Sequence, residues 1–138
     1  MGVYRGIAQD NVTINSGTAT LQTLTVTGAF TASGGVRLPV AAVAATGSAQ
    51  SDAAALSEGL NVVSAADGTK GVKLPTAVAG MMVIVKNTAA AALKIYPATG
   101  GTVNALSANA AYSITNLTST LLVASSATQW YSVPLVAS

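Results

Sequence analysis

The chain has 138 residues, of which six are Lys or Arg and four are Asp or Glu, and it contains neither His nor Cys. Soluble domains are ordinarily about a quarter charged, so this surface carries few ions and few groups able to perform acid–base, thiolate or soft-metal chemistry. The six cations are scattered along the sequence, whereas nucleic-acid binders concentrate them on one face. No stretch reaches the ~20 apolar residues of a membrane span. The start has no apolar run of signal-peptide length, and we expect a protein made and assembled in the cytosol.

Residues 1–36 are predicted to form an extended arm. Between residues 18 and 33, Thr and apolar residues alternate with the period of two that is typical of a strand. Burying the few apolar side chains of this segment does not offset the backbone entropy lost on ordering it. The strand therefore needs a partner, and we predict that it intertwines with further copies of the chain. The predicted oligomer contacts are Leu21, Leu24, Val26 and Phe30.

A five-residue pattern occurs twice after a hinge at residues 34–36. Gly35-Val36-Arg37-Leu38-Pro39 returns as Gly71-Val72-Lys73-Leu74-Pro75, and small apolar residues follow each copy. Because proline lacks the N–H that a ladder requires, the simpler interpretation is two analogous strands, each ended by a proline. The alternative interpretation is a duplicated repeat unit.

Residues 37–138 are predicted to form one β-sandwich, barrel or jelly-roll-like domain. One short helix is expected over residues 51–59, because Ser51 suits an N-cap and Gly59 suits a left-handed helix end. From there on, short apolar runs alternate with turns about every ten residues, which is typical of all-β sandwiches and barrels. The predicted strands are residues 60–64, 81–86, 93–96, 102–106, 112–115, 121–124 and 130–133.

The four acidic residues offer no clear catalytic pair. Glycoside cleavage needs two carboxylates that face one bond, and the spacing of Asp52 and Glu58 puts them on different faces of a short helix. We expect Asp52 to support the helix start and Asp67 to make a turn. Without His there is no usual Ser-based triad, and without clustered Asp there is no all-oxygen calcium site. The sequence therefore predicts a non-enzymatic protein with no cofactor and no metal.

Two stretches resemble proteins of tailed bacteriophages. The run from Thr23 to Gly35, Thr-Leu-Thr-Val-Thr-Gly-Ala-Phe-Thr-Ala-Ser-Gly-Gly, resembles the Thr- and Gly-rich repeats of phage fibrous proteins. Further motifs are similar to the C-terminal β domains of small virion proteins, which include capsid decoration (cement) proteins and head fibres. These motifs are Gly59-Leu-Asn-Val-Val, Gly71-Val-Lys-Leu-Pro, Val83-Ile-Val-Lys-Asn-Thr, Tyr96-Pro-Ala-Thr-Gly and Ser126-Ala-Thr-Gln-Trp-Tyr131-Ser.

The resemblance covers residues 20–138 and implies a virion protein on the capsid exterior, commonly a trimer at three-fold or quasi-three-fold positions. The implied partners are further copies of the chain and the major capsid protein, with no nucleic acid and no membrane. We expect a homotrimer that cements the capsid by burying contacts. Tyr4, Arg5 and Ile7 are the predicted capsid-docking residues, since Tyr and Arg are favoured at contact hot spots.

Two alternative functions remain open from the sequence. The first is a fibre tip that binds a host-surface glycan or receptor through Trp130 or Tyr131, the only adjacent aromatic pair. On a strand these two side chains point to opposite faces, so one is expected in the core and the other at a subunit contact or on a sugar. The second is a polysaccharide-degrading enzyme, which would depend on Asp52 or Glu58.

Overall fold

The structure is a computed structural model that describes residues 25–32 and 34–135. The chain divides into two units, residues 1–36 and 37–138. The described part of the first unit, residues 25–32 and 34–36, contains no strand, and all of its side chains are exposed except the half-buried Ala32. The strand predicted for this segment pairs with other copies of the chain, so it stays a prediction.

The second unit is built from ten strands in two mixed sheets, and the prediction of an all-β fold is confirmed for the described residues. In spatial order, the six-stranded sheet consists of β1 (Val40–Ala44), β3 (Gly59–Ser64), β5 (Met82–Asn87), β9 (Ser119–Ala124), β10 (Gln129–Leu135) and β7 (Thr102–Val103). The four-stranded sheet consists of β2 (Ala54–Ala55), β4 (Gly71–Lys73), β6 (Leu93–Tyr96) and β8 (Tyr112–Ile114).

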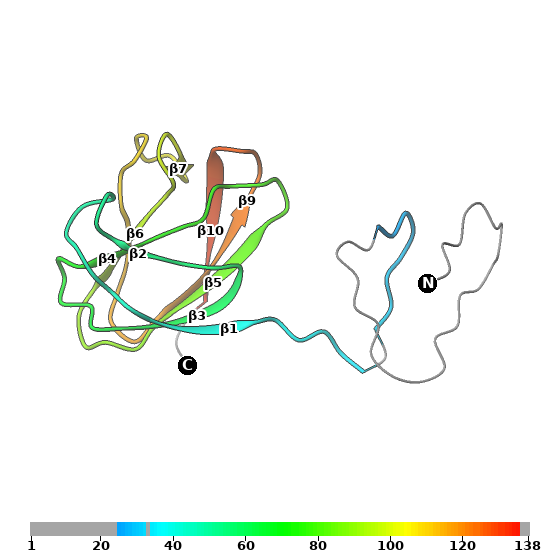
Figure 1. The fold of residues 1–138 in the computed structure, drawn as a ribbon, viewed down its shortest axis with the longest axis horizontal. Helices are drawn as coiled ribbons and strands as arrows, with labels where there is room; N and C mark the ends of the chain where they lie inside the picture. Colours follow the sequence, from blue (N-terminus) through cyan, green and yellow to red (C-terminus); the bar gives the residue numbers. More distant parts are fainter. Residues whose placement is uncertain (1–24, 33, 136–138) are drawn as a thin grey trace, which may run out of the picture. The chain divides into compact units, whose positions relative to one another are not determined.

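From β1 to β6 the chain follows a solenoid-like path. Successive strands alternate between the two sheets, and β1, β3 and β5 pair in parallel, as do β2, β4 and β6. Each circuit therefore places a strand beside the strand of the previous circuit, so that Leu60 lies between Val40 and Ile84. Figure 1 shows the four-stranded sheet on one side of this unit and β5, β9 and β10 on the other.

Antiparallel strands close the last circuit. β8 pairs with β6, and β9 pairs with β5 and with β10. β10 continues through Pro134, which lies opposite Thr120, so the prediction that this strand ends before Pro134 is wrong. The proline is tolerated because β7 pairs with β10 only at Gln129 and Trp130, which leaves the rest of β10 as an edge where no N–H is needed.

One hydrophobic core lies between the two sheets. Its fully buried side chains include Val63, Val83 and Leu122 from the six-stranded sheet, and Val72 and Ile95 from the four-stranded sheet. Alternate residues of each strand point inward, and the burial pattern of β9, half-buried and buried in turn, follows this rule.

Two buried asparagines hold the corners where the chain enters or leaves the six-stranded sheet. The Nδ2 of Asn61 donates to the carbonyl of Ser57 at 2.8 Å, and its Oδ1 accepts from the N–H of Ser57 at 3.1 Å. The Nδ2 of Asn87 donates to the carbonyls of Ala91 at 2.8 Å and Thr115 at 3.1 Å. These bonds satisfy backbone groups that have lost their strand partner, which a buried backbone requires.

The helix predicted over residues 51–59 is absent, and that prediction is wrong. Ala54 and Ala55 form β2 and pair with β4, while Ala53 and Leu56 are buried in the core. A helix of two turns is marginal in water even for Ala-rich sequence, so tertiary pairing outweighs the helix propensity of alanine. The Oδ1 of Asp52 accepts from the N–H of Ala49 and closes a turn instead of capping a helix.

The five-residue repeat and one predicted strand also differ from expectation. Residues 71–73 form β4, whereas residues 35–38 form no strand within a single chain, so the interpretation as two analogous strands holds there for the second segment only. The strand predicted over residues 102–106 is only Thr102–Val103, because Asn104 takes a left-handed conformation with φ of 53° and turns the chain away.

Candidate contact surface

The outer face of the six-stranded sheet is apolar across most of its width. Residues that lie opposite each other in a ladder present their side chains on the same face. The register aligns one apolar residue from each of five strands into a continuous row, and each is half-buried or exposed. This row consists of Val40, Leu60, Ile84, Leu121 and Val133.

The neighbouring rows continue the same apolar surface, which we call the apolar face. Met82, Val123 and Tyr131 form the row on one side. Ala42, Val62, Lys86, Ser119 and Leu135 form the row on the other. Lys86 is the one charged residue among the described strand residues of this face, and its Nζ donates to the carbonyl of Leu117. The apolar face is thus mostly made of aliphatic side chains although it lies on the surface of the chain.

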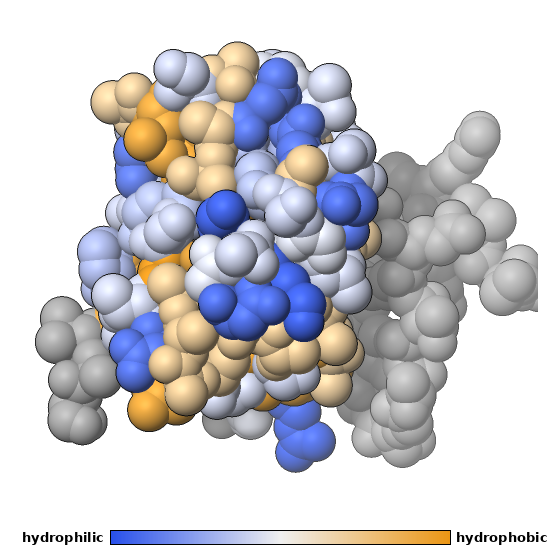
Figure 2. Space-filling view, turned by 90° about the vertical axis from the view of Figure 1, so that its left-hand side faces the viewer, coloured by the Kyte–Doolittle hydropathy of each residue, from blue (hydrophilic) through white to orange (hydrophobic). Residues whose placement is uncertain are grey.

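The outer face of the four-stranded sheet has the opposite character. Lys73, Lys94 and Ser113 lie on it, and the ring of Tyr96 covers Gly71 while its Oη donates to the carbonyl of Ser48 at 2.8 Å. Figure 2 views the molecule from this side, where hydrophilic residues occupy much of the middle and apolar residues are scattered between them. The two outer faces therefore offer different chemistry to a partner.

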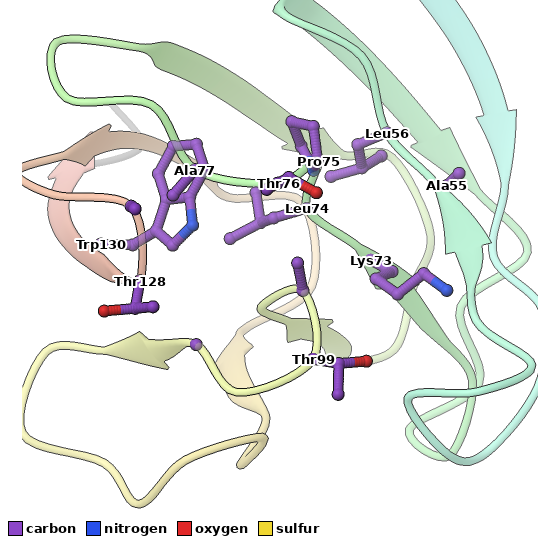
Figure 3. A pocket seen from close by; sticks show the side chains of 13 residues that line it. Ala55, Leu56, Lys73, Leu74, Pro75, Thr76, Ala77, Thr99, Thr128 and Trp130 are labelled. Atoms are coloured by element: carbon purple, nitrogen blue, oxygen red, sulfur yellow. The ribbon is translucent and has the colours of Figure 1, made fainter.

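A cavity of about 420 Å³ opens beside the core (Figure 3). Leu56, Leu74 and Trp130 supply apolar walls, several threonines supply hydroxyl groups, and Lys73 is its one charged lining residue. In Figure 3 the side chain of Lys73 extends away from Trp130. No carboxylate is among the described residues that line the cavity, so it holds no pair of acids for cleaving a glycosidic bond.

The aromatic pair divides between the two faces of β10. Trp130 is only 1% exposed and belongs to the core, so its ring offers no open face for a sugar. Tyr131 is 53% exposed and lies on the apolar face beside Val123. Of the two residues considered for glycan contact, only Tyr131 is accessible.

The acidic residues in the described part of the chain are dispersed, and two of them close turns. Asp52 and Glu58 are both exposed, and no hydrogen bond or ion pair joins them among the described residues. Asp67 makes a turn as predicted. Its Oδ1 accepts from the Thr69 hydroxyl at 2.7 Å and from the N–H groups of Thr69 and Lys70 at 2.9 Å each. These bonds, the one from the Thr69 hydroxyl first, hold the pKa of Asp67 well below its usual range.

Most of the remaining predicted contact residues lie outside the described part of the chain: Tyr4, Arg5, Ile7, Leu21 and Leu24. Val26 and Phe30 are described and exposed in the first unit. Sequence reasoning missed the apolar face. Its signal was present in Val83-Ile84-Val85 and Leu121-Leu122-Val123, where both alternating sets of residues are apolar, a pattern normally found in strands covered on both sides.

Within residues 25–32 and 34–135, no group of three or more acidic, His or Cys side chains is placed to hold a metal ion. The same residues contain no helix with the length and hydropathy of a membrane span. Comparison of the chain with protein-family models, with curated proteins and with solved structures gives no match.

Proposed function

We propose that the protein is a non-enzymatic structural component of a phage virion, a homotrimer that decorates and cements the capsid exterior. The observation that carries the proposal is the apolar face. Large contiguous apolar patches on soluble proteins mark interaction surfaces, and a face with a single cation fits burial against another protein better than binding to a charged ligand. The phage assignment draws on the Thr- and Gly-rich run before residue 36 and on the β-domain motifs after residue 59.

In this proposal the two units of the chain make different contacts. Residues 1–36 intertwine with their copies through Leu21, Leu24, Val26 and Phe30, and Tyr4, Arg5 and Ile7 dock on the major capsid protein. The second unit, with two sheets packed about one core as in a β-sandwich or jelly roll, lies against neighbouring copies or capsid subunits through its apolar face. Three linked contacts give an avidity that one copy lacks.

The first test is the mass of the assembly, which light scattering should give as three times that of one chain. The second compares two exposed positions on opposite faces after coexpression with the major capsid protein encoded in the same genome. Val133→Asp puts a charge on the apolar face and should reduce co-sedimentation with capsids at least tenfold, whereas Ser113→Asp on the four-stranded sheet should not. Equal binding by both variants, or a monomeric mass, contradicts the proposal.

A fibre tip that binds a glycan is the second candidate, and the exposure of Tyr131 is the observation that favours it. Sugars stack on exposed aromatic rings, and Tyr131 lies beside the apolar Val123, with Met82 on the far side of Val123 in the same row. A glycan array with the wild type and Tyr131→Ser distinguishes the two functions. Binding that disappears in the variant supports the fibre tip, and negligible binding by both supports the capsid protein.

A further inference from the structure

The four-stranded sheet has an open edge at β2. Ala54 and Ala55 pair with β4 on one side, and β2 is the last strand of the described sheet on the other. The N–H of Leu56 donates to the carbonyl of Lys73 at 2.8 Å. Because alternate residues of a parallel strand direct their backbone groups to the same neighbour, the N–H and C=O of Ala55 point toward the open edge. The two residues of this edge are neither charged nor proline, two of the features that protect a sheet edge against pairing with another chain.

The sequence contains a third segment of the kind that forms this sheet. Ala54-Ala55-Leu56 precedes Val72-Lys73-Leu74 by 18 positions, which is the register offset between β2 and β4. Another 18 positions earlier the chain reads Val36-Arg37-Leu38. The five-residue repeat of the sequence thus corresponds to two solenoid circuits, with β2 as the unrecognised middle copy.

The leucine that ends each copy makes the same bond in successive circuits. The N–H of Leu56 donates to the carbonyl of Lys73, and the N–H of Leu74 donates to the carbonyl of Tyr96 at 2.9 Å. Both leucine side chains are buried in the core. Leu38 is the equivalent residue of the first copy, but its side chain is 46% exposed. The first copy therefore matches the other two in sequence and differs from them in burial.

We propose that residues 36–38 of a second copy add to the edge of β2 as a parallel strand. Arg37 then lies opposite Ala55, the N–H of Leu38 donates to the carbonyl of Ala55, and the N–H of Ala55 donates to the carbonyl of Val36. The contact belongs to the β-augmentation class of recognition, in which an extended segment lengthens a sheet.

We assign the segment to another copy because the connection within one chain is two residues shorter than the corresponding connection of the next circuit. The N–H of Leu60 donates to the carbonyl of Pro39 at 2.9 Å, and Pro39 packs so closely on Gly59 that a Cβ at Gly59 would lie 2.5 Å from its carbonyl oxygen. Pro39 is therefore fixed beside Gly59. Residues 56–58 connect β2 to Gly59, whereas Leu38 alone separates Arg37 from Pro39.

The side chains fit the proposed register. Val36 and Leu38 point to the core side of the sheet, toward Ala54 and Leu56, and Arg37 points to the outer face with Ala55. Two strand spacings, ~10 Å, separate Arg37 from Lys73. Repulsion at that distance between exposed charges is largely screened at physiological ionic strength. Pro39 favours the pairing, since a residue that precedes proline is held in the extended region.

Site-specific disulfides test the register, and the chain has no native Cys to interfere. Residues directly opposite in neighbouring strands lie within the Cα separation that a disulfide allows. Chains carrying Arg37→Cys and chains carrying Ala55→Cys, coexpressed and mildly oxidised, should give a band of twice the chain mass that reduction removes. The matched control replaces Arg37→Cys with Val36→Cys, whose side chain points to the opposite face, and should give no such band.

The proposal rests on the proposed self-association, and the two fail in different ways. Absence of the band, or a band of equal strength in the control, overturns the register. A chain that carries both Arg37→Cys and Ala55→Cys and closes the bond within one chain also overturns it. If light scattering gives a trimeric mass together with any of these results, only the proposed strand pairing is contradicted. A monomeric mass of the wild type contradicts both the homotrimer and the strand pairing.

Discussion

The ring of Tyr96 lies across Gly71, so that a Cβ added to Gly71 would stand 2.7 Å from Cε2 of the ring. The two residues are diagonal neighbours, because Gly71 pairs with Lys94, two residues before Tyr96. A bare backbone on β4 and an aromatic ring on β6 thereby form one packed surface.

Gly71→Ala should destabilise the second unit by about 1–3 kcal/mol, since the added methyl group forces the ring out of place. Urea denaturation measures the change in the free energy of unfolding. Gly34→Ala is the control, because nothing lies within 4 Å of a Cβ at Gly34. A similar loss in both variants would mean that the ring does not impose the requirement for glycine.

Tyr96→Phe keeps the ring over Gly71 and removes the bond from Oη to the carbonyl of Ser48. The expected loss is about 0.5–1.5 kcal/mol, the usual net value of one such bond. The melting temperature should therefore fall by less than in Gly71→Ala. A greater fall in Tyr96→Phe would assign the main stabilisation to the hydroxyl group instead of the ring.

Asn61→Ala should destabilise the fold by about 1–3 kcal/mol, because it leaves the backbone of Ser57 without its buried partner. Denaturant titration followed by Trp130 fluorescence gives the value, since Trp130 is buried in the same core. Asn116→Ala, in an exposed turn, is the matched control and should remain within 0.5 kcal/mol of the wild type, the usual range of a surface substitution.

Leu121 and Leu122 are adjacent on β9 and lie on opposite faces of the sheet. Leu122→Ala should cost about 2–5 kcal/mol of stability, as for other buried leucines. Leu121→Ala should cost much less in the dissociated chain but should weaken the assembly, which analytical ultracentrifugation measures. Equal effects of the two variants on assembly would remove the apolar face from the contact.

The lowered pKa of Asp67 predicts a pH dependence of stability. A carboxylate whose pKa is lower in the folded state stabilises the fold fully above its unfolded value, about 3.9. That contribution is lost as the pH falls toward the folded value. Asp67→Asn should therefore flatten the melting temperature profile below about pH 4. Thr69→Val removes the hydroxyl donor and keeps the carboxylate, so it should flatten the same profile to a smaller extent. An unchanged profile in both variants would contradict the stabilisation of the Asp67 carboxylate by this turn.

Strand positions could be predicted from this sequence to a large extent, and their partners could not. The runs at residues 60–64, 93–96 and 121–124 are apolar enough to identify β3, β6 and β9 locally. The parallel pairing of β1 with β3 depends on which distant strands meet, and no local pattern records that. The prediction of a helix over residues 51–59 was wrong for the same reason: the strand partner of Ala54 and Ala55 lies 18 positions away on β4.

The contact surface was hidden from sequence reasoning by an ambiguity in the pattern. A strand such as β5, with apolar residues of both parities, is expected to be covered on both sides. In the structure only one face of β5 is covered, by the core, and Met82 and Ile84 lie on the outer face of the sheet. The composition, with few charges in the whole chain, indicated that some surface is covered, but a count of charges does not tell which one.

The antiparallel closure by β9 and β10 has a consequence for biogenesis. The ribosome makes β1 before β10, so the indole of Trp130, which belongs to the core, emerges after all the strands from β1 to β9. Until then the strands of the nascent chain expose unpaired backbone groups and apolar side chains. Folding of the second unit is thus completed only once β10 has emerged, and until then neighbouring nascent chains on one messenger RNA can mispair through their exposed strands.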